Sequence, residues 1–94
     1  AADVPRAKAL ELYAVQQPIA KTLFNGSTVN AAWHTKPSWY AVSSNDQTIN
    51  PDLERFLAKR MNATTIELPS SHLSLVSHAK AITDLILEAS GRQP

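Results

Sequence analysis

The pattern of apolar and polar positions predicts two β-strands. Residues 39–42 form a short, continuous apolar run with aromatic and β-branched side chains, which is typical of a strand buried on both faces. Residues 64–68 alternate instead, with Thr64, Ile66 and Leu68 on one face, which is typical of a half-exposed strand at the margin of a sheet. The sequence therefore predicts one interior strand and one strand near an edge.

A helix is predicted between the two strands, over residues 52–61. The apolar positions on one face of this segment are Leu53, Phe56, Leu57 and Met61. Asn50 is expected to cap the helix, and Pro51 suits its first position because a proline ring fixes a helical φ and lacks an N–H that would go unpaired there. A strand, a helix and a second strand in this order indicate a parallel pair.

A last helix is expected near the end of the chain. Ser77 can cap it after an irregular turn over residues 73–78, and Gly91 is expected to end it. Its apolar stripe consists of Ile82, Leu85, Ile86 and Ala89. The predicted fold class is therefore α/β, with two parallel strands that are each followed by a helix.

Two further helices are expected before the first strand. Asp3 can cap a helix with Pro5 in its first turn, and residues 18–24 can form a second short helix that stops at Gly26. The apolar face of the first helix consists of Ala7, Leu10, Tyr13 and Ala14. Residues 27–36 then lead back to the sheet. The sequence downstream contains nothing that is obviously meant to cover these helices.

Two chemically useful side chains follow the two predicted strands. Asp46 lies in the polar loop after the first strand, and His72 lies in the loop after the second. Parallel neighbours lie about 4.8 Å apart and end at the same sheet edge, so a carboxylate after one strand can accept a hydrogen bond from an imidazole after the next. An imidazole that exchanges a proton and a carboxylate that orients it are the parts of a general-base site.

Plainer interpretations exist for each candidate residue. Asp46 alone is a common turn residue, and a loop histidine such as His72 is often only a surface group. His34 and His78 have no partner at metal-ligand spacing and are expected to be structural or surface residues. The aromatic residues near the first strand are expected to be core rather than pocket residues; they are Trp33, Trp39 and Tyr40.

Composition removes several classes of function. The chain has 94 residues, a formal net charge of +1 and no basic stripe, so nucleic acid is not an expected partner. No apolar stretch is long enough to cross a bilayer, so no membrane partner is expected. The absence of cysteine excludes disulfides and thiolate metal sites but leaves the compartment open. Because residue 1 is alanine rather than methionine, Ala1 is not expected to be a natural translation start.

Several segments together resemble the C-terminal third of an α/β-hydrolase. These are Asn45-Asp46-Gln-Thr-Ile49-Asn-Pro51, the amphipathic run 52–61, and Ser71-His72 before the last helix. Residues 37–40 and 56–60 are most similar to the branch of small bacterial esterases and cofactor-free haloperoxidases. The resemblance covers about residues 1–90. It implies that residues 1–24 are the end of the helical cap and that residues 25–94 are the C-terminal β-α-β-α part of the core.

The resemblance also implies roles for the two candidate residues. Asp46 matches the acid of a Ser-His-Asp triad and His72 matches its general base, and the order Ser, Asp, His is the order of this superfamily. The chain has only two glycines, Gly26 and Gly91, so it contains no G-x-S-x-G nucleophile elbow. We therefore expect the nucleophilic serine to lie in an N-terminal part of the same hydrolase, and this chain to be inactive alone and incomplete as a stand-alone domain.

The reaction implied by the resemblance is hydrolysis of a small carboxylic ester through an acyl-enzyme, without a metal or an organic cofactor. Two alternatives stay open: a non-catalytic binding relative or inactive fragment, and a perhydrolase or C–C bond hydrolase that uses the same triad. Related hydroxynitrile lyases have lysine after the histidine, whereas this chain has Leu73, so lyase chemistry is not expected.

Overall fold

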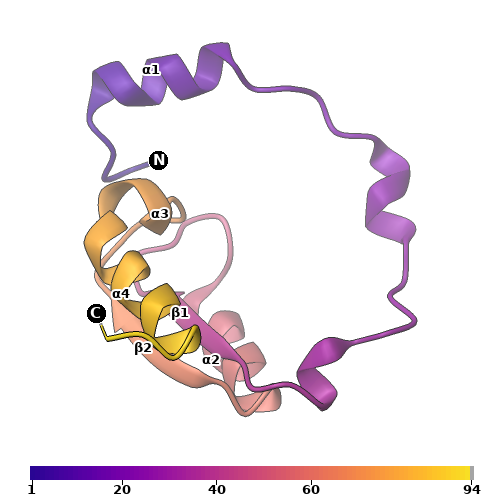
Figure 1. Ribbon diagram of the computed structural model, residues 1–94. Coiled ribbons are helices and arrows are strands. Elements are labelled where there is room, and N and C mark those ends of the chain that lie inside the picture. The colour runs from indigo at the N-terminus through magenta and orange to yellow at the C-terminus, as the bar shows by residue number, and fades with distance from the viewer. Residues whose placement is uncertain (94) are drawn as a thin grey trace.

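The fold is built on a small parallel sheet with helices around it, as a computed structural model describes it for residues 1–93 (Figure 1). The elements in chain order are α1 (Arg6–Ala14), the 3₁₀ helices η1 (Lys21–Asn25) and η2 (Ala32–His34), β1 (Trp39–Ser43), α2 (Pro51–Arg60), β2 (Thr64–Leu68), α3 (Ser74–Ser77) and α4 (Ala79–Ala89). The coarse α/β class and the predicted parallel pairing are confirmed.

The two strands pair in a register that brings their carboxyl ends together. Tyr40 lies opposite Thr65, and Ser43 lies opposite Leu68. Burial increases along β1 until Val42 is completely buried, whereas β2 alternates between exposed and half-buried positions. The marginal position predicted for β2 agrees with this pattern, but the first residues of β1 are only half-buried.

Helix α2 begins and ends as its sequence signals indicate. The Asn50 side chain accepts a hydrogen bond of 2.8 Å from the backbone N–H of Asp52, and Pro51 occupies the first turn. At the other end Asn62 has a φ of +51°, a left-handed conformation that asparagine tolerates, and the next residue, Ala63, donates to the carbonyl of Ala58 at 3.0 Å. This reversal turns the chain directly into β2.

The face of α2 that packs on the sheet differs from the predicted one. Glu54 and Ala58 are its buried residues, with exposed fractions of 5% and 2%. Two members of the predicted apolar face, Leu53 and Phe56, are 47% and 60% exposed. The prediction is wrong here because helical spacing ranks side chains by apolarity, whereas the packing of α2 against β1 selects a small residue and a carboxyl group one turn apart.

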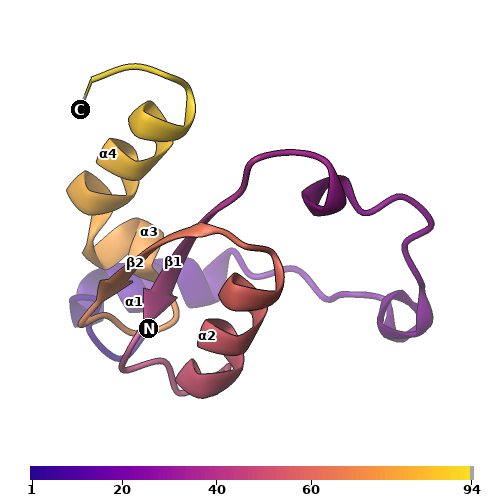
Figure 2. The same ribbon diagram turned by 90° about the horizontal axis from the view of Figure 1, so that it is seen from below.

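Helix α4 supplies the other main contact to the sheet, and the two helices lie on opposite sides of it (Figure 2). Ile82 and Leu85 are buried as the predicted stripe requires, although Ile86 is 59% exposed. Gly91 follows the helix with a φ of +79°, and the helix ends there as predicted.

The turn before α4 also departs from expectation. Residues 74–77 form the short helix α3 rather than an irregular turn. Ser77 does not cap α4, because its hydroxyl donates to the carbonyl of Leu73 at 3.3 Å, and the residue at the cap position is His78.

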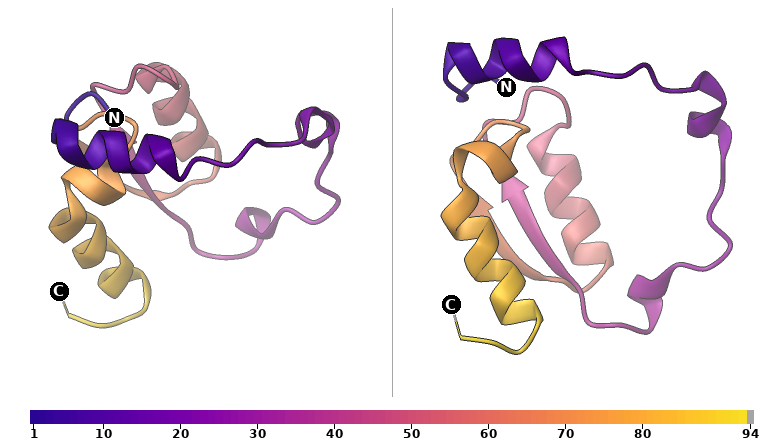
Figure 3. Two further views of the ribbon diagram at one scale, coloured as in Figure 1. Left: turned by 90° about the horizontal axis from the view of Figure 1, so that it is seen from above. Right: turned by 45° about the horizontal axis from the view of Figure 1, so that its top comes forward.

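The N-terminal part is attached to the sheet mainly through its first residues. Helix α1 lies beside α3, and the chain then arcs outward through η1 and η2 before it enters β1 (Figures 1 and 3). Asp3 does not cap α1, and the predicted apolar face is wrong, because Leu10 and Tyr13 are 54% and 82% exposed. The predicted helix over residues 18–24 is reduced to the 3₁₀ turn η1.

The core is small for a chain of this length. Its buried apolar residues are Val4, Val42, Ala58, Ile82 and Leu85. The radius of gyration is 15.0 Å, whereas a compact chain of this length has about 12 Å. The accessible surface is 7436 Å², whereas folded proteins of this mass expose about 5,400 Å². Large apolar side chains of the N-terminal arc and of the outer helix faces are exposed, among them Tyr13, Phe24 and Phe56.

Candidate functional site

Asp46 sits in a tight loop directly after β1. Its backbone N–H donates to the carbonyl of Ser43 at 3.2 Å, which closes the turn. Its carboxylate oxygen Oδ1 then accepts hydrogen bonds from the N–H groups of Thr48 at 2.7 Å and Ile49 at 2.9 Å. Aspartate is favoured in such turns because its side chain replaces a backbone acceptor. The loop therefore fixes one carboxylate oxygen and leaves Oδ2 for another donor.

Backbone hydrogen bonds hold this loop against the loop that carries His72. Ser44 donates its N–H to the carbonyl of Leu68 at 2.9 Å, and Asn45 donates to the carbonyl of Ser70 at 3.1 Å. The β1–β2 ladder is thus extended past the end of both strands. This extension explains why residues 26 positions apart meet at the sheet edge.

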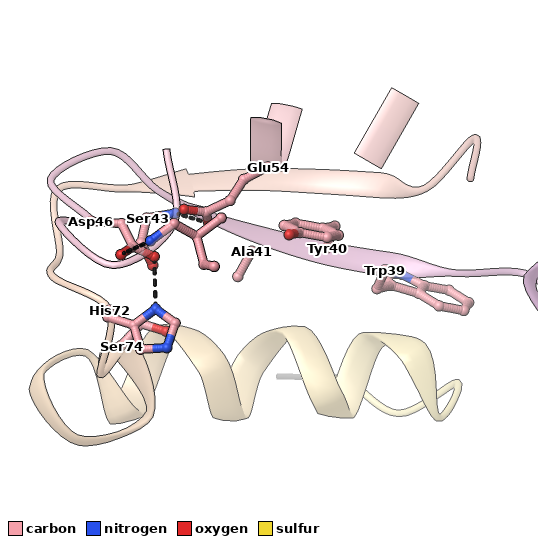
Figure 4. A pocket seen from close by; sticks show the side chains of 9 residues that line it. Trp39, Tyr40, Ala41, Ser43, Asp46, Glu54, His72 and Ser74 are labelled. Atoms are coloured by element: carbon pink, nitrogen blue, oxygen red, sulfur yellow. Dashed lines mark hydrogen bonds and ion pairs between the residues drawn. The ribbon is translucent and has the colours of Figure 1, made fainter. Parts of the chain in front are cut away.

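His72 Nδ1 lies 2.9 Å from Asp46 Oδ2 (Figure 4). The carboxylate side chain is only 3% exposed, whereas the imidazole is 43% exposed. The second ring nitrogen, Nε2, has no hydrogen-bond partner within residues 1–93. The contact between the two side chains that the sequence predicted is present in the structure. The catalytic roles of the two residues stay predictions.

The charge state of Asp46 follows from its hydrogen bonds. Burial by itself raises the pKa of this carboxyl, but the bonds from His72, Ile49 and Thr48 outweigh burial and hold the pKa well below its usual range. Asp46 is consequently an acceptor at neutral pH, so Nδ1 of His72 carries the hydrogen in the contact. In neutral His72 the remaining nitrogen, Nε2, is then a base.

A cleft of about 270 Å³ opens beside the pair. Its lining residues are Trp39, Tyr40, Ala41, Ser43, Asp46, Ile49, Glu54, His72 and Ser74 (Figure 4). Trp39 and Tyr40 thus line this cleft, although the sequence predicts them to be core residues. Trp33 lies elsewhere, where it stacks on His34 with ring centroids 3.8 Å apart.

Glu54 is a residue of this site that the sequence did not reveal. Its position predicts only a helix-end role, because acidic residues in the first turn of a helix face its positive end. In the structure its Oε1 accepts the backbone N–H of Ser43 at 3.0 Å, beside Asp46. The available signal was its spacing of four residues from Ala58, which places both on one face of α2.

Asp3 is a second residue whose place was missed. Its carboxylate accepts the N–H of Ser71 at 3.0 Å and also the Ser71 hydroxyl, across 68 residues of sequence. The hydrogen bonds from the side chain and backbone of Ser71 lower the pKa of Asp3 to about 2. The start of the chain therefore holds the residue immediately before His72.

Ser43, Ser70 and Ser71 near the pair are engaged with other groups, whereas Ser74 lines the cleft and its hydroxyl makes no hydrogen bond within residues 1–93. Ser70 Oγ donates to the carbonyl of Ser71 at 2.9 Å and lies 3.2 Å from Ser43 Oγ. Within residues 1–93 no serine hydroxyl hydrogen-bonds to His72.

The other two histidines do not form a comparable site. His78 Nδ1 lies 3.0 Å from Ser77 Oγ and 3.8 Å from Asp3 Oδ2, so serine and aspartate meet the same ring nitrogen rather than opposite ones. A triad needs them on opposite nitrogens. In the part of the chain that the structure describes, no cluster of His, Asp or Glu side chains is suited to hold a metal ion.

Comparisons of this chain with protein-family models, with curated proteins and with solved structures found no match. Among residues 1–93, no helix has both the length and the apolar character required to cross a membrane. The functional interpretation therefore depends on the residues of the site and on their geometry.

Proposed function

We propose that this chain is the C-terminal part of an α/β-hydrolase-fold serine esterase, and that it contributes the acid and the base of a Ser-His-Asp triad. The observation that carries the proposal is the 2.9 Å contact between His72 Nδ1 and a buried, backbone-held Asp46. The free Nε2 is on the side where a serine hydroxyl has to approach. The nucleophile belongs to an N-terminal part of the same hydrolase.

In the proposed reaction, His72 Nε2 takes the proton of the serine hydroxyl while the serine oxygen attacks the ester carbonyl carbon. The protonated His72 then gives this proton to the departing alcohol, which leaves an acyl-enzyme. Water attacks the acyl carbon in the second half, with His72 again the base, and the carboxylic acid is released. Asp46 stabilises the imidazolium in both halves without taking its proton.

The open flank of β1 supports the incompleteness of the chain. Just past the end of β1, Ser44 donates its N–H to the carbonyl of Leu68, and just before β1 the carbonyl of Ser38 accepts the N–H of Thr64. Backbone groups alternate along a strand, so those of Trp39 and Ala41 face away from β2. Within residues 1–93 no other strand pairs with β1. A neighbouring strand from the N-terminal part would satisfy these groups and would complete a larger parallel sheet.

Mass spectrometry with a fluorophosphonate probe tests the proposal. The protein is measured under native and denaturing conditions, before and after incubation with the probe, which labels activated serines. We expect a second polypeptide, or a longer form of this chain, to carry the label. Native protein that contains only these 94 residues and takes no label would support the alternative of a binding module instead.

A further inference from the structure

Glu54 has an unusual environment for a charged residue. It is 5% exposed, and its Oε2 is buried without a hydrogen-bond partner. Its Oε1 accepts a hydrogen bond of 3.0 Å from Ser43 N, and its carboxyl is also within hydrogen-bonding reach of the Asp46 carboxyl. No lysine, arginine or histidine within residues 1–93 forms an ion pair with it. An ionised carboxylate is costly in such a place, because neither water nor a cation compensates its charge.

The neighbours of Glu54 decide which group carries the negative charge. The titratable groups that face it are Tyr40 from β1, Asp46 from the following loop and His72 from the loop after β2. Asp46 has three donors, namely Thr48 N, Ile49 N and the His72 ring. When two carboxyl groups share one site, the group with more donors ionises and the other keeps its proton.

Glu54 also contacts the residue at which the Asp46 turn begins. Ser43 is the last residue of β1, and its carbonyl accepts the N–H of Asp46 at 3.2 Å. The N–H of the same residue is held by Glu54 from α2, on the side of the sheet opposite to α4 (Figure 4). Glu54 therefore fixes the peptide from which the Asp46 turn begins.

We propose that Glu54 is a positioning residue that keeps its proton to a higher pH than an ordinary glutamate and ties α2 to the start of the Asp46 turn. Its consequence for turnover rests on the proposed function, but its protonation and its contact are properties of this chain. Burial raises the pKa of Glu54, and the neighbouring Asp46 raises this pKa further against the lowering effect of the Ser43 hydrogen bond.

Carbon-13 NMR of the carboxyl groups and amide hydrogen exchange test this directly. The Glu54 side-chain carbon should titrate above the ordinary glutamate value of about 4.3. Glu54→Gln keeps the shape and the oxygen that accepts the Ser43 N–H but cannot ionise, so the exchange protection of the Ser43 and Asp46 amides should stay near wild type. Glu88→Gln, at an exposed position of α4, is the control for replacing a glutamate that does not hold the turn.

Two results would overturn the inference. One is a Glu54 carbon that titrates at or below the ordinary value. The other is exchange protection of the Ser43 and Asp46 amides that is the same in Glu54→Ala as in wild type, because the carboxyl would then not hold the turn. Neither result depends on ester turnover, so they are separate from failure of the proposed function. In an active enzyme, Glu54→Ala should lower kcat by about tenfold, whereas kcat of Glu54→Gln should stay near the wild-type value.

Discussion

At the scale of single residues, the candidate site is a buried acid that holds an exposed base. Asp46 has one oxygen saturated by the backbone and the other on His72 Nδ1. These hydrogen bonds keep the Asp46 carboxylate ionised and keep the His72 proton on Nδ1, the nitrogen that faces it. In neutral His72, Nε2 is basic because the hydrogen bond to Asp46 keeps the proton on Nδ1.

Replacing Asp46 by asparagine should remove this control while preserving the turn. An amide oxygen can still accept from Thr48 and Ile49, but its NH₂ group facing His72 favours the tautomer whose Nε2 carries the hydrogen. We expect kcat of the complete enzyme to fall by about 10⁴-fold. Ester kinetics measure this fall, and unchanged far-ultraviolet circular dichroism verifies that the fold is preserved. A loss smaller than tenfold would contradict the orienting role.

Asp3 should give the chain a specific acid sensitivity. Its pKa is about 2 in the folded protein and about 3.9 when unfolded. A lowered folded pKa means that its contribution to stability is complete above about pH 4 and is lost as the pH falls through about 2. In urea unfolding, the stability difference between wild type and Asp3→Asn should therefore shrink across this window. A difference that stays constant with pH would contradict the Asp3–Ser71 contact.

At the scale of elements, the sequence signals predicted the start of α2 and the end of α4 correctly. They predicted less well which side chains are buried, because burial depends on contacts with residues far away in the sequence. Asn50 and Pro51 identified the start of α2, and Gly91 identified the end of α4, because caps act within one turn. The position of Glu54 in the first turn of α2 predicts only a helix-end role, and Asp3 is predicted to cap a helix. Their partners lie 11 and 68 positions away, so no periodicity in their own segments could have revealed them.

The same contrast explains what was predicted of the site. Asp46 and His72 could be placed at one edge, because parallel strands that are joined by a helix share a carboxyl end. The details that set their chemistry, such as the two backbone donors and the Glu54 side chain above β1, depend on loop conformation and helix orientation. The hydrophobic pattern carries neither kind of information.

The two glycines give a matched test of the helix ends. Gly91 has a φ of +79° and open space where the methyl group of an alanine would lie, whereas Gly26 has a φ of −72°. Gly91→Ala should destabilise the chain by about 1 kcal/mol through its left-handed backbone alone. Gly26→Ala should change stability by no more than about 0.5 kcal/mol, because any residue adopts that φ. Denaturant unfolding measures both, and equal effects would contradict the assigned end of α4.

At the scale of the whole molecule, the fold is an open structure with one unpaired sheet flank. Its surface is larger than its mass requires, and large apolar side chains such as Tyr13, Phe24 and Phe56 are 82%, 76% and 60% exposed. Surfaces of this kind are usually covered by another part of a protein. The proposed N-terminal part would supply such cover together with the missing serine.

Amide hydrogen exchange should locate that cover. Val42 donates towards β2 and should be protected in this chain by itself, whereas Ala41 faces the open flank. We expect the Ala41 amide to become protected only when the serine-bearing part is present, while Val42 changes little. Protection of both amides in the isolated chain would show that the flank is already covered.

The base role proposed for His72 is tested most directly by ester turnover of the proposed complete enzyme with His72 replaced by alanine. His34→Ala is the control, because His34 stacks on Trp33 and lies outside the cleft. If His72 is the general base, kcat should fall by at least about 10³-fold in His72→Ala and stay near wild type in His34→Ala. Unchanged turnover in His72→Ala would contradict the assignment of the triad base.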